Sequence, residues 1–159
     1  MPSSKYPLQP LLEHRERAVD DRTAELGGAV RARENAERAK AQAAASQRAA
    51  QAEAAAVRAH EQDRLAQGEL SVADLARGQA WEIGAQARIA ALGRATATAD
   101  DKARAATSAE SAARGQLAQA MADRDVVTKD EARFKERLVK KQVAAEEEQA
   151  EEAWRGDKK

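Results

Sequence analysis

The stretch Gln67-Gly68-Glu69-Leu70-Ser71-Val72-Ala73-Asp74 decides the fold, because it is the clearest break in an otherwise helical sequence. Gly68 suits the end of a helix, where a left-handed backbone conformation costs glycine nothing. Ser71 and Asp74 have the spacing of a capping box, in which the serine caps a new helix and the acidic residue occupies its third position. We therefore expect the chain to reverse direction at residues 67–71.

On both sides of this break, the composition is typical of long helices and not of a compact globule. Hydrophobic residues make up 43% of the 159 residues, but aromatic residues make up only 3%, and alanine dominates the apolar positions. Full burial of a Leu or Phe side chain contributes roughly 1.5–3 kcal/mol, and an alanine methyl contributes much less. Such a core cannot offset the chain entropy of a globule, whereas Ala, Glu, Arg and Gln are strong helix formers. The sequence therefore predicts an all-α protein.

The apolar pattern predicts two helices of unequal length. It begins at Leu8 and resumes after the break, with a local weakening at Gly27-Gly28 that makes a bend plausible there. We expect one elongated domain, an antiparallel two-helix coiled-coil hairpin with a longer C-terminal helix. Its expected parts are an irregular leader at 1–7, a helix at 8–67, a turn at 68–71, a second helix at 72–155 and a tail at 156–159.

A seven-residue repeat supplies the predicted seam between the helices. One series in the second helix is apolar throughout, and the series interleaved with it is half polar, which fits a two-stranded coiled coil with a left-handed supercoil. The first helix carries Ala29, Ala36, Ala43, Ala50 and Val57. The second helix carries Ala85, Leu92, Ala99, Ala106, Ala113, Ala120, Val127 and Phe134, interleaved with Leu75, Glu82, Ile89, Thr96, Ala103, Glu110, Leu117, Arg124, Glu131 and Leu138.

A reversal near residue 69 also predicts a register, in which residue i lies opposite residue 138 minus i. Leu12 then lies near Val127, and Trp81 covers the seam opposite Val57. Residues 131–155 have no intramolecular partner in this register, although they include the apolar Phe134. We therefore expect self-association at high concentration, through pairing of two such segments.

The same sequence argues against several classes of function. It has no cysteine, so it has neither disulfides nor thiolate metal sites, and its 27 basic and 27 acidic residues create no overall field for nucleic acid. No apolar run approaches the roughly 20 residues that span a bilayer, and residues 1–7 lack the apolar stretch of a secretory signal. His14 and His60 lie far apart without companion ligands. We expect a cytoplasmic protein without enzyme activity, cofactor or metal, because two helices also offer no concavity for an active site.

Two stretches resemble a known family. The N-terminal Tyr6-Pro7-Leu8-Gln9-Pro10-Leu11-Leu12-Glu13-His14-Arg15-Glu16-Arg17 resembles the opening of the FliJ-type flagellar export proteins, in which an aromatic precedes a Leu-Gln-x-Leu-Leu-x-x-Arg-like pattern. The C-terminal Phe134-Lys135-Glu136-Arg137-Leu138-Val139-Lys140-Lys141, with the Glu-rich tail after it, resembles that family's charged Glu-Lys-Leu-x-x-Arg segment. The resemblance covers about a quarter of the chain. The alanine-rich middle and the pair Gly27-Gly28 depart from the family.

The resemblance implies a specific role. FliJ-type proteins are small cytoplasmic components of type III secretion systems, in flagella and in injectisomes, and are two-helix antiparallel coiled coils similar to the central stalk of rotary ATPases. They sit in the ring of the export ATPase, at the base of the membrane complex, link it to the export-gate protein and escort export chaperones. The end that enters the ring is formed by the N- and C-terminal helical segments. Its partner-binding residues here would be Leu8, Leu11, Leu12, Arg133, Phe134, Arg137, Leu138, Lys140 and Lys141.

Another class of function remains open from the residues alone. A structural coiled-coil spacer or scaffold, unrelated to secretion, would have the same composition and the same repeat. A nucleic-acid binder fits less well, because the basic residues alternate with acidic ones. The discriminating property is a secretion ATPase partner, which only the stalk interpretation requires.

Overall fold

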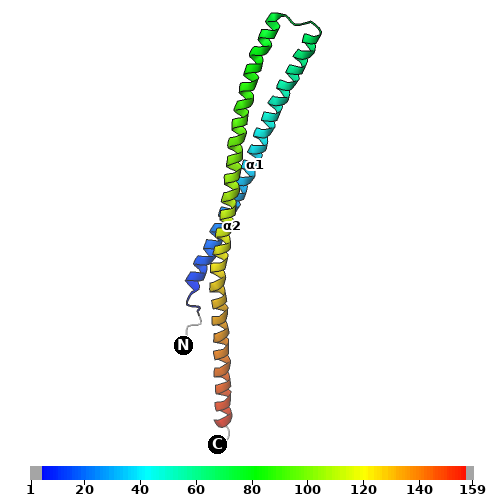
Figure 1. Ribbon diagram of the computed structural model, residues 1–159. Coiled ribbons are helices and arrows are strands. Elements are labelled where there is room, and N and C mark those ends of the chain that lie inside the picture. The colour runs from blue at the N-terminus through cyan, green and yellow to red at the C-terminus, as the bar shows by residue number, and fades with distance from the viewer. Residues whose placement is uncertain (1–4, 157–159) are drawn as a thin grey trace. The chain divides into compact units, whose positions relative to one another are not determined.

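The computed structural model describes residues 5–156 and is built from two α-helices, labelled in Figure 1. Helix α1 runs Gln9–Ala66 and helix α2 runs Val72–Gly156, where the sequence analysis expects helices at 8–67 and 72–155. The described residues contain no strand, and the predicted all-α class with two helices is confirmed. Residues 1–4 of the expected leader and 157–159 of the expected tail lie outside the described part of the chain.

Helix α1 ends in a glycine-dependent hydrogen-bond pattern. Gly68 has a φ of 74°, in the left-handed region that glycine adopts without steric cost. The Gly68 N–H donates to the carbonyl of Leu65, and the Glu69 N–H donates to the carbonyl of Arg64, both at 3.0 Å. These two bonds form a Schellman motif, so Gly68 has the predicted role.

Helix α2 begins at the predicted capping box. The Asp74 N–H donates to the Ser71 hydroxyl oxygen at 3.2 Å, and the Ser71 N–H donates back to a carboxylate oxygen of Asp74 at 3.0 Å. Hydrogen bonds from the Ser71 hydroxyl and N–H, followed by one from Arg77, hold the pKa of Asp74 well below its usual range. The cap therefore contributes stability at neutral pH, and this contribution is lost as the pH falls below about 4.

The chain forms two compact units, each with part of both helices. The turn unit comprises residues 28–111, and the described part of the terminal unit comprises residues 5–27 and 112–156. In α1 the division falls between Gly27 and Gly28, the pair expected to weaken this helix. The helix itself is continuous through both glycines.

Ion pairs join the two helices in the turn unit. The partner's residue number falls along α2 as the number rises along α1. The predicted register places residue 58 opposite residue 80 and residue 53 opposite residue 85. The partners of Lys40, Glu53 and Arg58 lie two or three residues further along α2, because the turn is centred closer to Leu70 than to Glu69, and the partner of Arg33 lies five residues further. The pairs are Arg33–Glu110 (2.5 Å), Lys40–Asp100 (2.6 Å), Glu53–Arg88 (3.4 Å) and Arg58–Glu82 (2.5 Å).

Side-chain burial in the turn unit follows the seven-residue repeat. One continuous set of covered positions alternates spacings of three and four residues, as the predicted seam does, but it does not include Val57 and Leu75 of that seam. These two side chains are exposed, and Val57 shares a hollow with Gly78, which has no side chain to cover it. The buried or half-buried seam residues are Ala29, Arg33, Ala36, Lys40, Ala43, Gln47, Ala50 and Ala54 of α1 and Glu82, Ala85, Ile89, Leu92, Thr96, Ala99, Ala103, Ala106 and Glu110 of α2.

Candidate partner-binding surfaces

The terminal unit is held by a small cluster, here called the clasp, of Tyr6, Leu12, Val127 and Phe134. The first three are buried, and Phe134 packs against them. The rings of Tyr6 and Phe134 have centroids 5.5 Å apart and are tilted by 55°, a favourable geometry for an aromatic pair. The prediction that Phe134 has no intramolecular partner is therefore wrong, and Tyr6 is a core residue although it lies in the expected leader.

The clasp also has a polar contact. The Tyr6 hydroxyl donates to a carboxylate oxygen of Asp130 at 2.8 Å and lies 3.4 Å from the carbonyl oxygen of Val127. Burial of the phenol and its hydrogen bond to Asp130 raise the pKa of Tyr6 to about 12. This contact could have been predicted from the register. The register places residue 6 opposite residue 132, which lies midway between Asp130 and Phe134 on neighbouring turns of α2.

The raised pKa of Tyr6 can be measured directly, because Tyr6 is the only tyrosine. We expect the tyrosinate absorbance of the native protein to titrate with a midpoint near pH 12, against about 10 for the chain in denaturant. The folded state holds its proton more tightly than the unfolded chain does. The stability from this contact is therefore complete below about pH 10 and is lost as the pH rises towards 12. A native midpoint near pH 10 would contradict the burial of Tyr6 and its hydrogen bond to Asp130. The variant Tyr6→Phe, which has no titrating phenol, gives the background absorbance.

The structure brings the expected partner-binding residues into one unit, but it makes only some of them available. Leu12 is buried in the clasp, Phe134 packs on it and Leu138 is half-buried, so these three stabilise the unit and offer little surface. The remaining residues are exposed and form what we call the terminal surface. It consists of Leu8 and Leu11 of α1 and Arg133, Arg137, Lys140 and Lys141 of α2.

Acidic side chains of α2 lie among the basic residues of the terminal surface in the sequence. Glu131 pairs with Lys135 at 2.7 Å, and Glu136 pairs with Lys140 at 2.8 Å, both within α2. The pair of Glu136 with Lys140 is exposed, and such a pair between neighbouring helical turns is worth about 0.3–0.5 kcal/mol. An incoming acidic group can therefore displace Glu136 from Lys140 at little cost.

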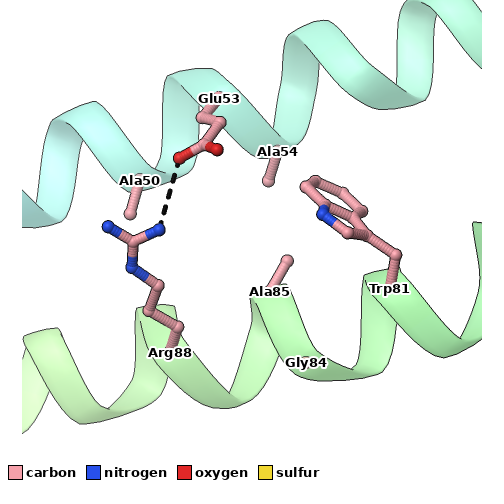
Figure 2. Close-up of a pocket in the computed structure, with 7 residues that line it drawn as sticks. All are labelled: Ala50, Glu53, Ala54, Trp81, Gly84, Ala85 and Arg88. Atoms are coloured by element: carbon pink, nitrogen blue, oxygen red, sulfur yellow. Dashed lines mark hydrogen bonds and ion pairs between the residues drawn. The ribbon is translucent and has the colours of Figure 1, made fainter.

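A hollow of about 270 Å³ lies between the helices of the turn unit. Figure 2 shows the indole of Trp81 at one end, the ion pair of Arg88 with Glu53 at the other, and alanine methyl groups between them. The expectation that two helices offer no concavity is therefore wrong. Trp81 is 40% exposed, so it covers the seam only in part. The lining residues are Ala50, Glu53, Ala54, Trp81, Gly84, Ala85 and Arg88.

Two polar contacts interrupt the alanine seam of the turn unit. Glu110 is only 6% exposed and contacts the guanidinium of Arg33 at 2.5 Å. Nearby, the hydrogen bond between Lys40 and Asp100 raises the pKa of Lys40 and lowers that of Asp100, and Arg104 lowers the pKa of Asp100 further. Lys40 and Asp100 are therefore both charged at neutral pH. A positive charge of α1 thus faces a negative charge of α2 in the seam.

Within residues 5–156, no helix combines the length and the apolar character that a membrane crossing requires. The same part of the chain holds no group of three or more His, Asp or Glu side chains that could share a metal ion. No protein-family model, curated protein or solved structure matches this chain.

Proposed function

We propose that this chain is the central stalk and escort component of a type III secretion export apparatus, flagellar or injectisome. The observation that carries this proposal is the clasp. Its residue Tyr6 opens one of the two stretches that resemble the FliJ-type family, and Phe134 opens the other. A contact between these two stretches is what a shared partner-binding end requires.

The architecture that we propose is an antiparallel coiled coil. The opposite direction of the paired segments in the turn unit supports it, as does the alternation of three and four residues between covered positions. A straight α-helix drifts by about 20° per seven residues from such a seam. The covered positions keep this spacing from Glu82 to Glu110, and such a repeat favours a supercoil of the two helices.

In this proposal, the terminal surface enters the ring of the export ATPase, and the chain also contacts the export-gate protein and export chaperones. It has no catalytic role or cofactor of its own and acts in the cytoplasm, at the base of the membrane complex. A stalk must release and remake its contacts during turnover. Exposed charges suit this requirement, because each such ion pair is worth only about 0–1 kcal/mol.

The proposal predicts the effect of reversing the basic charges. Changing Arg133, Arg137 and Lys140 together to Glu should weaken binding to the cognate secretion ATPase about tenfold or more at low salt, from the loss of three such contacts. Stimulation of ATP hydrolysis should fall with it. Helicity by circular dichroism should be unchanged, since all three side chains are exposed.

A matched control is available in the turn unit. Arg31, Arg38 and Arg48 are also exposed, and their change to Glu alters the net charge by the same amount. This control variant should bind the ATPase like the unmodified protein. If the unmodified protein neither binds nor stimulates the ATPase at low salt, the stalk proposal fails and the structural spacer remains.

A further inference from the structure

The C-terminal segment of α2, residues 139–156, is a helix whose side chains are all exposed. The uncovered part of α2 begins after Leu138 and not at residue 131, because the clasp occupies Phe134. The C-terminal segment nevertheless carries an apolar stripe on one face. The stripe consists of Val139, Val143, Ala150 and Trp154, at spacings of four, seven and four residues, which place side chains above one another on a helix.

A row of charged side chains runs beside this stripe, and its charge changes sign at Ala144. Its members are three or four residues apart and so share one flank of the helix. The row is basic before Ala144 and acidic after it. In chain order it contains Arg133, Arg137, Lys140, Ala144, Glu147 and Glu151.

We propose that two copies of this chain pair through their C-terminal segments in antiparallel orientation, with Ala144 near the two-fold axis. In a two-fold symmetric pair the same surface meets itself in reverse. Arg137 then lies beside Glu151 of the partner subunit, and Lys140 lies beside Glu147 of the partner subunit. A parallel pair would place like charges together along the whole flank, so the charge row selects the antiparallel arrangement.

The pair should be weak and sensitive to salt. About an axis at Ala144, residue i lies opposite residue 288 minus i, so Val139 and Val143 meet the C-terminal segment of the second copy and Trp154 lies beyond it. The apolar contact is therefore small, and the flanking charges remain at the edge of the interface. Contacts of this size fall in the range of transient complexes, and ion pairs at an exposed rim are screened by salt. Dimers should therefore form at high protein concentration and dissociate on dilution.

Sedimentation equilibrium of the full chain tests the pairing. At about 0.5 mM protein, the concentration range of a weak interface, the mean mass should rise from the 17.1 kDa of one chain towards twice that value. It should fall back when the salt is raised from about 50 mM to about 500 mM. A mass of one chain at low salt and high concentration overturns the proposal.

Charge reversal tests the role of the flank. One variant carries Arg137→Glu and Lys140→Glu, and a second carries Glu147→Lys and Glu151→Lys. Each should dimerise about tenfold more weakly alone, because its own flanks repel, and an equimolar mixture of the two should regain the dimer. The control Arg38→Glu with Arg48→Glu should dimerise like the unmodified chain. Dimerisation that is equally strong in all variants refutes the charge-selected pairing.

Spin labels test the orientation, and the absence of native cysteine allows single labels. Labels at Ala144→Cys should lie close together in the dimer. Labels at Ala153→Cys should be about 27 Å apart, given nine residues on each side of the axis and a rise of 1.5 Å per residue. Short distances at both positions indicate a parallel pair and overturn the proposal.

Discussion

Arg33→Ala is expected to lower the free energy of unfolding by about 1.5–3 kcal/mol, because it removes the guanidinium that contacts a buried carboxylate inside the seam. The side chain of Glu110 is only 8% exposed, whereas that of Arg33 is 35% exposed. Removing the other partner, by Glu110→Leu, should lower the free energy of unfolding less, because the guanidinium of Arg33 can turn towards water. Urea denaturation followed by circular dichroism measures both values, and Arg38→Ala serves as the exposed control.

The double variant Arg33→Leu with Glu110→Leu separates an ion pair from two independent effects. Replacing both partners by apolar groups removes both charges from the seam, so this variant should be at least as stable as the more stable of the two single variants. The two changes should thus be strongly non-additive. This expectation is wrong if each single change lowers the free energy of unfolding by less than about 0.5 kcal/mol and the double variant shows the sum of the two effects. The contact would then contribute nothing to stability.

The same pair bears on how the helices choose their register. Ala29, Ala36, Ala43 and Ala50 are identical side chains seven residues apart, so a slip by one repeat preserves nearly all alanine contacts. Such a slip would separate Arg33 from Glu110, placing Arg33 opposite Ala103 or Leu117 and Glu110 opposite Leu26 or Lys40. Polar residues in an apolar seam are a known way to specify register, and the double variant should therefore show more than one pairing by cross-linking.

Tyr6→Ala is the second change with a large expected effect, about 2–4 kcal/mol, from the loss of a buried aromatic ring and of its contact with Phe134. The effect should be local, because the clasp belongs to the terminal unit alone. Amide hydrogen exchange should speed up in residues 9–27 and 112–134. Protection in residues 36–60 of the turn unit should stay unchanged.

Tyr6→Phe provides the matched control. It keeps the ring against Phe134 and removes only the hydroxyl that donates to Asp130, so its cost should be about 1 kcal/mol. Unchanged exchange in the terminal unit of Tyr6→Ala would show that the clasp does not hold that unit. If the stalk proposal is correct, Tyr6→Ala should also weaken ATPase binding, because the clasp joins the N-terminal part of α1 to α2 within the terminal unit.

The sequence alone determined where the two helices meet the turn and most of the side chains that they cover in the turn unit. Gly68, Ser71 and Asp74 act through hydrogen bonds to residues at most five positions away, so local chemistry is sufficient to predict them. The seam can also be predicted from the sequence, because the seven-residue repeat is a property of each helix by itself. Its polar members, including Glu110, keep the same spacing as the alanines.

Only the tertiary structure decided which residues meet across the helices. The contact of Tyr6 with Phe134, the pairing of Arg33 with Glu110 and the hollow beside Trp81 all depend on the register. Alanine repeats are nearly equivalent to one another and do not encode that register locally. It follows from the few large or charged side chains whose burial depends on a partner far away in the sequence, and a shift of two or three residues changes which of them are neighbours.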